Sequence, residues 1–369
     1  IGFGIYLINF ASSFLKTFIA GWFLGFGWFS FGLYWIGSAF VVADTYHTLL
    51  MPIAIIVLPS FLSIFWGIAC LCAKLASKNK TFCIIYIIIF ISFFEYLRAK
   101  MFTGFPWLMP SMVLSSNEYL IQIFSFIGSF SANLVVLTIS VLPFILFSNF
   151  NGKYFVFSLL SIPILFLISS GIFRYYNKDI SKTKDELITL VQPNIEQKNK
   201  WNLKNRDKHL KKLILLSSAN IEALGKKKRI IIWPETSFEG SIPKEIKFLS
   251  SISQQVLKNQ NTILVVGLLR TEGSKLFNSL VFLGHKGKVL YQYDKLKLVP
   301  FGEYIPFRKY LRPFSNFLPQ KDFNSGKLKS NPTIDGFGKI ITLICYEILF
   351  ADEIFNRISK NTNLLINIT

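Results

Sequence analysis

The stretch KIITLICYE, residues 339–347, decides how the second half of this chain folds. Its apolar run predicts a buried strand over 339–344, with Cys345 directly after the last strand residue. Catalytic groups gather at such positions, because a rigid element holds them while the following loop leaves them open. A thiolate attacks carbonyl carbon well, so Cys345 is a candidate nucleophile. A buried structural cysteine is the alternative.

Strands and helices are predicted to alternate around this stretch. The turn His285-Lys286-Gly287-Lys288 predicts a hairpin between two of the strands. The alternation predicts an α/β layered fold. The predicted strands are 187–192, 229–233, 262–268, 277–284, 289–293 and 363–368, and the predicted helices are 202–224, 243–258 and a short one near 347–358.

Two further residues have chemistry that suits a nucleophilic thiol. Glu235 follows the strand 229–233 and a proline, where a carboxylate can accept a thiol proton and later return it. Lys295 follows the hairpin, where a fixed ammonium can stabilise an oxyanion. Taken singly, Glu235 is also typical of a solvated loop acid, and Lys295 is one lysine among many. His209 and His285 lie in no motif that predicts a Cys-His pair.

The first half of the chain is apolar and the second half is charged. The 369 residues are 52% hydrophobic with a mean hydropathy of +0.46, above the usual range of soluble domains. Residues 1–172 contain three acidic and seven basic residues, and the remainder contains 17 acidic and 33 basic ones. This division predicts a transmembrane helical bundle over 1–174 and a catalytic domain over 185–369.

Five apolar runs are long enough to cross a bilayer, which takes about 20 residues as a helix. Lysines occur in alternate loops (Lys16, 74–80 and Lys153), which the positive-inside rule places in the cytoplasm. The charged half is then predicted to be extracytoplasmic, although Arg98 and Lys100 lie on the same side. The predicted spans are 17–41, 49–73, 81–97, 119–148 and 154–172, and residues 1–15 look like the end of a further helix.

Glu95 and Arg98 lie at the boundary of one predicted span. Ionisable groups there are costly unless they are paired or functional. Their helical spacing predicts an ion pair, and a functional role is the alternative.

The net charge of +20 does not predict nucleic-acid binding, because the lysines are scattered and no recognition motif accompanies them. A basic domain held against anionic lipid headgroups is the simpler interpretation, and compositional drift is the alternative. Cys70, Cys72 and Cys83 lie in apolar stretches and are predicted to be small buried hydrophobes. No disulfide, metal site or cofactor is predicted. The chain does not begin with Met and stops on a strand-like run, so we expect it to be truncated at both ends.

Three motifs occur in the order and rough spacing of the nitrilase superfamily. With the apolar half, they make the chain similar to the bacterial apolipoprotein N-acyltransferases over nearly its whole length. Residues 103–107 (TGFPW) and 191–197 (VQPNIEQ), with Trp201 close behind, resemble that family too. The three motifs are Trp233-Pro234-Glu235, the stretch from Lys295 through Pro300-Phe301-Gly302-Glu303, and Ile344-Cys345-Tyr346-Glu347.

The resemblance implies an αββα sandwich attached to the helical bundle, and it implies roles for seven residues. The family continues beyond the strand 363–368 with more of the sandwich and a last spanning helix, which this sequence lacks. Glu235 is implied to be the general base, Lys295 the oxyanion stabiliser and Cys345 the nucleophile, with Glu303 and Glu347 as supporting carboxylates and Trp201 and Tyr346 as pocket residues.

The resemblance also implies the substrates. A phospholipid donates the acyl group, and a diacylglyceryl-modified lipoprotein accepts it. The implied protein is a monomer among the lipids of the bacterial inner membrane, with its catalytic domain facing the periplasm. A membrane-anchored nitrilase-like amidase, in which water takes the second step, is one alternative. A non-enzymatic membrane protein with an inert sandwich is the other.

Overall fold

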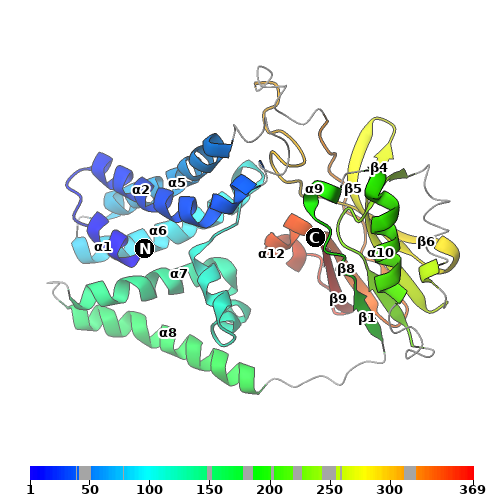
Figure 1. The fold of residues 1–369 in the computed structure, drawn as a ribbon. Helices are drawn as coiled ribbons and strands as arrows, with labels where there is room; N and C mark the ends of the chain where they lie inside the picture. The colour runs from blue at the N-terminus through cyan, green and yellow to red at the C-terminus, as the bar shows by residue number, and fades with distance from the viewer. Residues whose placement is uncertain are drawn as a thin grey trace. The chain divides into compact units, whose positions relative to one another are not determined.

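The chain forms two compact units, Ile1–Ser181 and Lys182–Thr369 (Figure 1). The first is helical and the second contains the sheets. The structure is a computed structural model, and it describes residues 1–38, 40, 51–77, 79–147, 152–177, 186–200, 203–218, 227–242, 255–257, 260–310 and 321–369.

The first unit contains five helices that are long and apolar enough to cross a membrane. The first begins at Phe14, earlier than predicted, because the Ser13 side chain accepts a hydrogen bond from the Lys16 backbone N–H at 3.2 Å and caps it. A separate short helix, α1 (Gly2–Ile8), precedes it. The five helices are α2 (Phe14–Leu33), α5 (Met51–Ala76), α6 (Lys80–Lys100), α7 (Ile123–Leu146) and α8 (Lys153–Tyr176).

The predicted span 119–148 is not one continuous helix. The 3-10 turn Leu120–Gln122 leads into α7, and Gly128 interrupts the helix at φ 73° and ψ 169°. Glycine adopts this backbone conformation readily because it has no Cβ. The break explains why the apolar run is longer than a single span requires.

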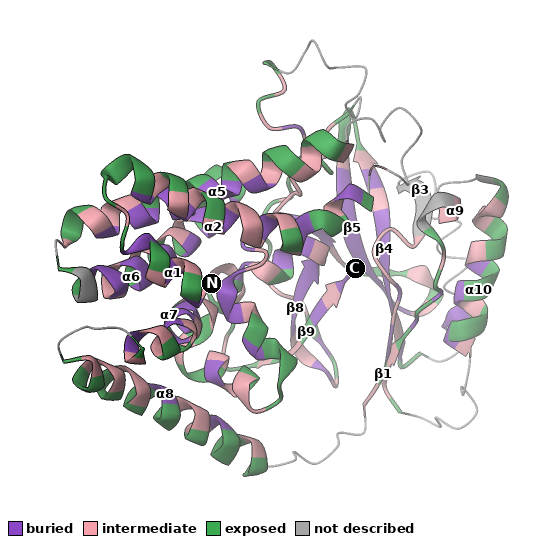
Figure 2. Ribbon diagram, turned by 60° about the vertical axis from the view of Figure 1, so that its left-hand side comes forward, coloured by how far each residue is buried: buried purple, intermediate pink, exposed green. Residues whose placement is uncertain are grey.

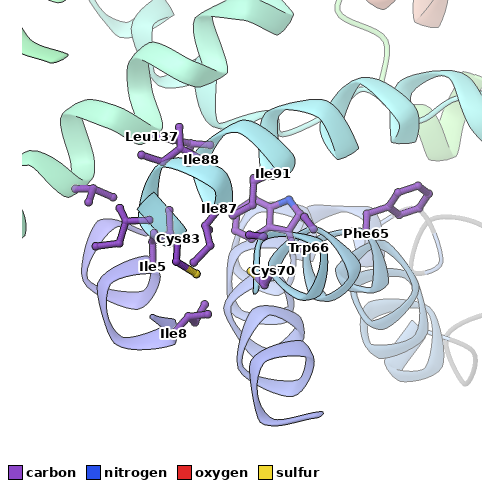
Figure 3. Close-up of a cluster of buried hydrophobic side chains, with 14 of the residues drawn as sticks. Ile5, Ile8, Phe65, Trp66, Cys70, Cys83, Ile87, Ile88, Ile91 and Leu137 are labelled. Carbon is purple, nitrogen blue, oxygen red and sulfur yellow. The ribbon is translucent and has the colours of Figure 1, made fainter. Parts of the chain in front are cut away.

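One apolar core joins α1, α2, α5, α6 and α7. Figure 3 shows Trp66 and Cys70 of α5 beside Ile87 and Ile91 of α6. Helix α8 differs, because only Ile164 and Gly171 of its residues are buried and most of its surface is exposed (Figure 2). An apolar helix with so little protein cover is expected to face lipid.

The charged residues near the end of α6 form the predicted ion pair. Arg98 and Glu95 are both buried and lie 2.5 Å apart, and Trp66 donates to the same carboxylate at 2.8 Å. Arg98 also donates to the carbonyls of Phe105 and Trp107, the latter at 3.0 Å. The pair therefore attaches the irregular 104–107 segment to the helices.

The second unit contains two sheets. In the larger sheet, the described strands include four that run parallel, and two antiparallel pairings continue it as a meander. Its strands lie in the order β1 (Leu187–Leu190), β2 (Arg229–Ile232), β4 (Thr262–Glu272), β5 (Lys275–Leu283) and β6 (Val289–Asp294), and β3 (Phe238–Ile242) also pairs with β4. The smaller sheet has the order β7 (Thr333–Ile334), β8 (Gly338–Ile344) and β9 (Thr362–Ile368).

Alternate residues of the strands enter different cores. On β5, Leu280 and Phe282 pack against β8 and β9, whereas Val281 and Leu283 pack with helix α10 (Arg206–Ser218). Successive side chains of a strand point to opposite faces, so a strand that is covered on both faces contributes alternate residues to two cores. An α layer and two β layers are therefore described, in agreement with the predicted α/β class.

Several predicted boundaries were wrong. The β4–β5 hairpin extends over 262–283, because its edge residues continue to pair beyond the apolar runs. Strands β3 and β7 lack a strong apolar pattern and were not predicted. The helix predicted near 347–358 is a 3-10 turn, Cys345–Leu349, followed by α12 (Ala351–Phe355). The helix predicted over 202–224 begins at Arg206, and residues 202, 219–224, 243–254 and 258 of the predicted helices lie outside the described residues.

The ion pair in the first unit gives a stability prediction. We expect Glu95→Gln to lower the free energy of unfolding by about 3–5 kcal/mol, because it leaves a buried guanidinium without its carboxylate. The double variant Glu95→Gln/Arg98→Met should lose less than the two single variants combined. Thermal denaturation in detergent measures this, with exposed Glu118→Gln as the control. Additive losses would show that the pair does not act as a unit.

Candidate active site

Lys295 is a buried lysine held between two carboxylates. Its side chain is 1% exposed, and Nζ lies 2.9 Å from Glu303 Oε1 and 3.5 Å from Glu235 Oε1. Burial by itself lowers the pKa of this ammonium, but the charges of Glu303 and Glu235 outweigh burial, so the pKa is raised. Lys295 is therefore a permanently charged group at a fixed position.

Asn278 connects the same two carboxylates. Its Nδ2 donates to Glu235 Oε1 at 2.6 Å and to Glu303 Oε1 at 2.8 Å. This residue was not predicted. Its signal in the sequence is a polar side chain in the middle of the apolar strand 276–280. Asn278 and Lys295 both contact Glu235 Oε1 and Glu303 Oε1, and so hold these two oxygens close together.

Strand alternation explains why Asn278 and Lys295 meet. The Lys295 N–H donates to the Asn278 carbonyl at 2.8 Å, so the two residues continue the β5–β6 ladder. Leu280 and Tyr293, two residues away on each strand, belong to the core between the sheets. Asn278 and Lys295 therefore face the smaller sheet, in which β8 ends directly before Cys345.

Cys345 lies at a strained junction. It follows the last residue of β8 and has φ of +51°, which is uncommon for a residue with a Cβ. Burial raises the pKa of the Cys345 thiol, and the charge of Glu235 and a hydrogen bond to it raise the pKa further, whereas Lys295 acts in the opposite direction. The raised pKa favours the thiol form of Cys345 at rest, with the Glu235 carboxylate close enough to influence its ionisation.

Glu347 joins the loop after Cys345 to the loop after Lys295. Its Oε2 accepts from the Ile344 N–H at 2.8 Å, and its Oε1 accepts from the N–H groups of Leu296 at 2.7 Å and Lys297 at 3.1 Å. The Tyr293 hydroxyl donates to the same oxygen at 2.9 Å. This carboxylate therefore acts on the site through the backbone of both loops.

Contacts of Asp294 and Gly326 also fix the position of Lys295. Asp294 points to the opposite face of the sheet, where Arg270 donates to both its oxygens at 2.9 and 3.1 Å and Ser279 donates at 2.6 Å. The Gly326 N–H donates to the Lys295 carbonyl at 2.8 Å, and a Cβ on Gly326 would lie 2.2 Å from the Asp294 carbonyl oxygen. The backbone of Lys295 is therefore fixed on both sides.

The remaining predicted site residues have different surroundings. Glu303 is in the cluster, and its Oε2 accepts from the Val299 N–H at 2.8 Å. Tyr346 is buried against the Phe350 ring, with centroids 5.2 Å apart, and its predicted substrate contact stays a prediction. Trp201 lies outside the described residues. In the residues that the structure describes, no group of His, Cys, Asp and Glu could hold a metal ion.

A cavity of about 190 Å³ adjoins the cluster. Glu235 and Thr369 form part of its wall, and Thr369 also acts to lower the pKa of the Cys345 thiol. The geometry therefore combines a thiol, a carboxylate base and a fixed cation beside a cavity. These are the groups that covalent acyl transfer requires.

Family comparisons identify the class of both units. Residues 187–369 match the carbon-nitrogen hydrolase model, so the second unit is a carbon-nitrogen hydrolase domain. Residues 1–142 match the apolipoprotein N-acyltransferase N-terminal domain model. The chain belongs to the apolipoprotein N-acyltransferase family. With its five apolar helices, it is a membrane protein.

Relatives that bear this name match nearly the whole chain. An apolipoprotein N-acyltransferase from Rhodopseudomonas palustris is 30% identical over 91% of this chain and 65% of its own length. One from Allorhizobium ampelinum is 29% identical over 96% of this chain and 68% of its own length. The chain thus spans about two thirds of the length of these relatives. A carbon-nitrogen hydrolase structure from Helicobacter pylori G27 aligns at TM-score 0.31 and 19% identity, over 44% of this chain and 54% of its own.

The pKa shift of Cys345 predicts how its alkylation depends on pH. Iodoacetamide reacts with the thiolate, so the rate should rise with pH through the raised pKa of Cys345. Glu235→Gln removes a negative charge that raises this pKa, so the midpoint should move to lower pH. Lys295→Met removes a charge that lowers the pKa, so the midpoint should move higher. Mass spectrometry of the Cys345 peptide measures both. An unchanged midpoint in Glu235→Gln would contradict the assigned contact.

Gly267 gives a second prediction, because a Cβ there would lie 2.5 Å from the Pro234 carbonyl oxygen and 2.7 Å from Glu235 Cα. Both contacts are with backbone, so Gly267→Ala should displace Glu235 and destabilise the fold by about 1–3 kcal/mol. We expect a lower Tm. Gly284→Ala is the matched control, since its Cβ would meet only the flexible Leu290 side chain, at 3.0 Å. Equal effects of the two substitutions would contradict this packing argument.

Proposed function

We propose that this protein transfers a fatty acyl group from a phospholipid to the N-terminal amine of a diacylglyceryl-cysteine lipoprotein, the final step of lipoprotein maturation. In this proposal, residues 1–174 form the membrane bundle and residues 185–369 the catalytic domain. The observation that carries it is the placement of Lys295, buried between Glu235 and Glu303 on the side of the sheet facing Cys345. Family membership supports the choice of substrates.

The first half-reaction forms a thioester. The Cys345 sulfur attacks the ester carbonyl carbon while Glu235 accepts the thiol proton. Lys295 Nζ stabilises the oxyanion of the tetrahedral intermediate. When the ester C–O bond breaks, Glu235 returns the proton to the departing oxygen. A lysophospholipid leaves, and the acyl group stays on sulfur.

The second half-reaction releases the acyl group to nitrogen. The α-amine of the lipoprotein attacks the thioester carbonyl, and Glu235 accepts a proton from the attacking nitrogen. Lys295 stabilises the second oxyanion, and collapse of the intermediate expels the sulfur. The proton on Glu235 then returns to Cys345. Each step is easier than direct transfer between the two substrates, which is the benefit of covalent catalysis.

Four other residues have supporting roles in this proposal. Glu303 balances the Lys295 charge, and Glu347 holds the loops that carry Lys295 and Cys345. Tyr346 and Trp201 are proposed to contact substrate. The loop charges support an inner-membrane protein whose catalytic domain faces the periplasm. We propose a monomer, since the chemistry draws on one chain.

An acyl-enzyme assay tests the proposal. The purified protein, incubated with phospholipid labelled in its acyl chain, should acquire a label that neutral hydroxylamine removes. Cys345→Ala should abolish the label, and Glu235→Gln should slow its appearance by about 10²–10⁴-fold, because general-base catalysis is lost. Cys72→Ala, a half-buried cysteine of α5, is the control.

Addition of the acceptor separates transfer from hydrolysis. A diacylglyceryl-cysteine peptide should accept the label through an amide bond and discharge the enzyme. Label on Cys345→Ala equal to the wild type would overturn the proposal. Ammonia release from small amides, with no transfer to the peptide, would favour the nitrilase-like amidase instead.

A further inference from the structure

The cavity beside Glu235 has three basic residues in its lining. Lys200, Arg206 and His209 line it, and Glu235 is the one carboxylate side chain among its lining residues. The first two side chains are permanent cations near neutral pH, and imidazole is a donor in either protonation state. The wall therefore has the donors and the charge that an anion requires.

The charge of Glu235 does not cancel this excess. Glu235 Oε1 already lies beside Lys295 Nζ at 3.5 Å and accepts from Asn278 at 2.6 Å. Lys200 donates instead to the backbone carbonyl of Glu235 at 3.2 Å, which holds its ammonium beside the reacting groups. The carboxylate is thus compensated by Lys295 and Asn278, neither of which lines the cavity.

Apolar side chains complete the wall. Leu210 and Leu213 of α10 and Pro193 line it together with the basic residues. A site for a small inorganic ion needs no such surface, whereas the carbon skeleton of a glycerophosphoester does. At about 190 Å³ the cavity is smaller than a pocket for a whole drug-sized ligand, so it suits only the polar part of a phospholipid.

We propose that this cavity is the subsite for the phosphodiester of the acyl donor, with Lys200, Arg206 and His209 as its hydrogen-bond donors. The proposal rests on the proposed function and names the part of the donor that the site recognises. The lipoprotein acceptor brings an α-ammonium and no phosphate, so the three basic residues disfavour it there. Departure of the lysophospholipid then removes the anion before the amine arrives.

Kinetics of acyl-enzyme formation test the subsite. Lys200→Gln and Arg206→Gln should each raise the KM for the phospholipid about tenfold, because each removes one charge-assisted hydrogen bond, with a smaller change in kcat. His209→Ala should act in the same direction. Discharge of preformed acyl-enzyme by the acceptor peptide should be unchanged. Lys208→Gln and Lys211→Gln are matched controls. Both lysines are at exposed positions of α10, and each substitution removes one positive charge.

A neutral donor tests the subsite without any substitution. A phosphotriester with the same acyl chains should have a KM at least about tenfold higher than that of the diester on the wild type, and this difference should be smaller on Arg206→Gln, where one of the charge-assisted hydrogen bonds is already absent. Glycerophosphoethanolamine should compete with the donor more strongly than inorganic phosphate does. The comparison of diester and triester on the wild type stays informative even if a variant fails to fold.

The outcomes separate the two proposals. A wild type that forms no acyl-enzyme overturns the proposed function. A wild type that is active with diester and triester alike, or pocket variants no worse than the Lys208 and Lys211 controls, overturns the subsite alone. Competition by inorganic phosphate with an unchanged KM for phospholipid in the variants would assign the cavity to a free anion and also overturn it.

Discussion

A buried ammonium is the constraint on which the catalytic unit depends. Moving an unpaired charge out of water costs several kcal/mol, so Lys295 can be 1% exposed only where carboxylates face it. Glu235 and Glu303 fulfil this need, and Asn278 holds both in register. Fold and chemistry are thus linked, because the same pairing that permits the burial of Lys295 also holds Glu235, the proposed general base, next to a fixed cation.

The geometry of a strand pair distributes the supporting residues between two faces. Asn278 and Lys295 point between the sheets, and their neighbours Ser279 and Asp294 point to the helix-covered side, where Arg270 engages Asp294. A second buried charge pair therefore lies directly behind the first. A shift of one residue in the β5–β6 register would exchange the two sets and leave both charges unmatched, so the polar pairs specify the register as strongly as the apolar core does.

The sequence alone predicted the elements with long apolar runs and the residues that follow them. Glu235, Lys295 and Cys345 were found because each comes just after such a run and because motif order supports them. Asn278 was missed, since one polar residue in a strand is ordinary until its partners are known. The roles of Asp294 and Gly326 could not be predicted from the sequence either, because they depend on which strands pair and on how closely the backbones approach each other. The helix break at Gly128 could not be predicted, because glycine can adopt many φ and ψ values and the sequence does not say which.

The raised pKa of Cys345 bears on how a reactive thiol is kept inert between turnovers. A low-pKa thiolate would be nucleophilic at all times and open to oxidation. Here burial and Glu235 favour the thiol, so in the proposed mechanism the nucleophile forms only as its proton moves to the carboxylate. That transfer becomes favourable when an ester carbonyl is in place, because the developing oxyanion then shares the charge of Lys295. The cation is compensated by two carboxylates at rest, and it loses part of that compensation when Glu235 takes up the proton. Lys295 therefore interacts most strongly with the oxyanion at the moment when the oxyanion forms.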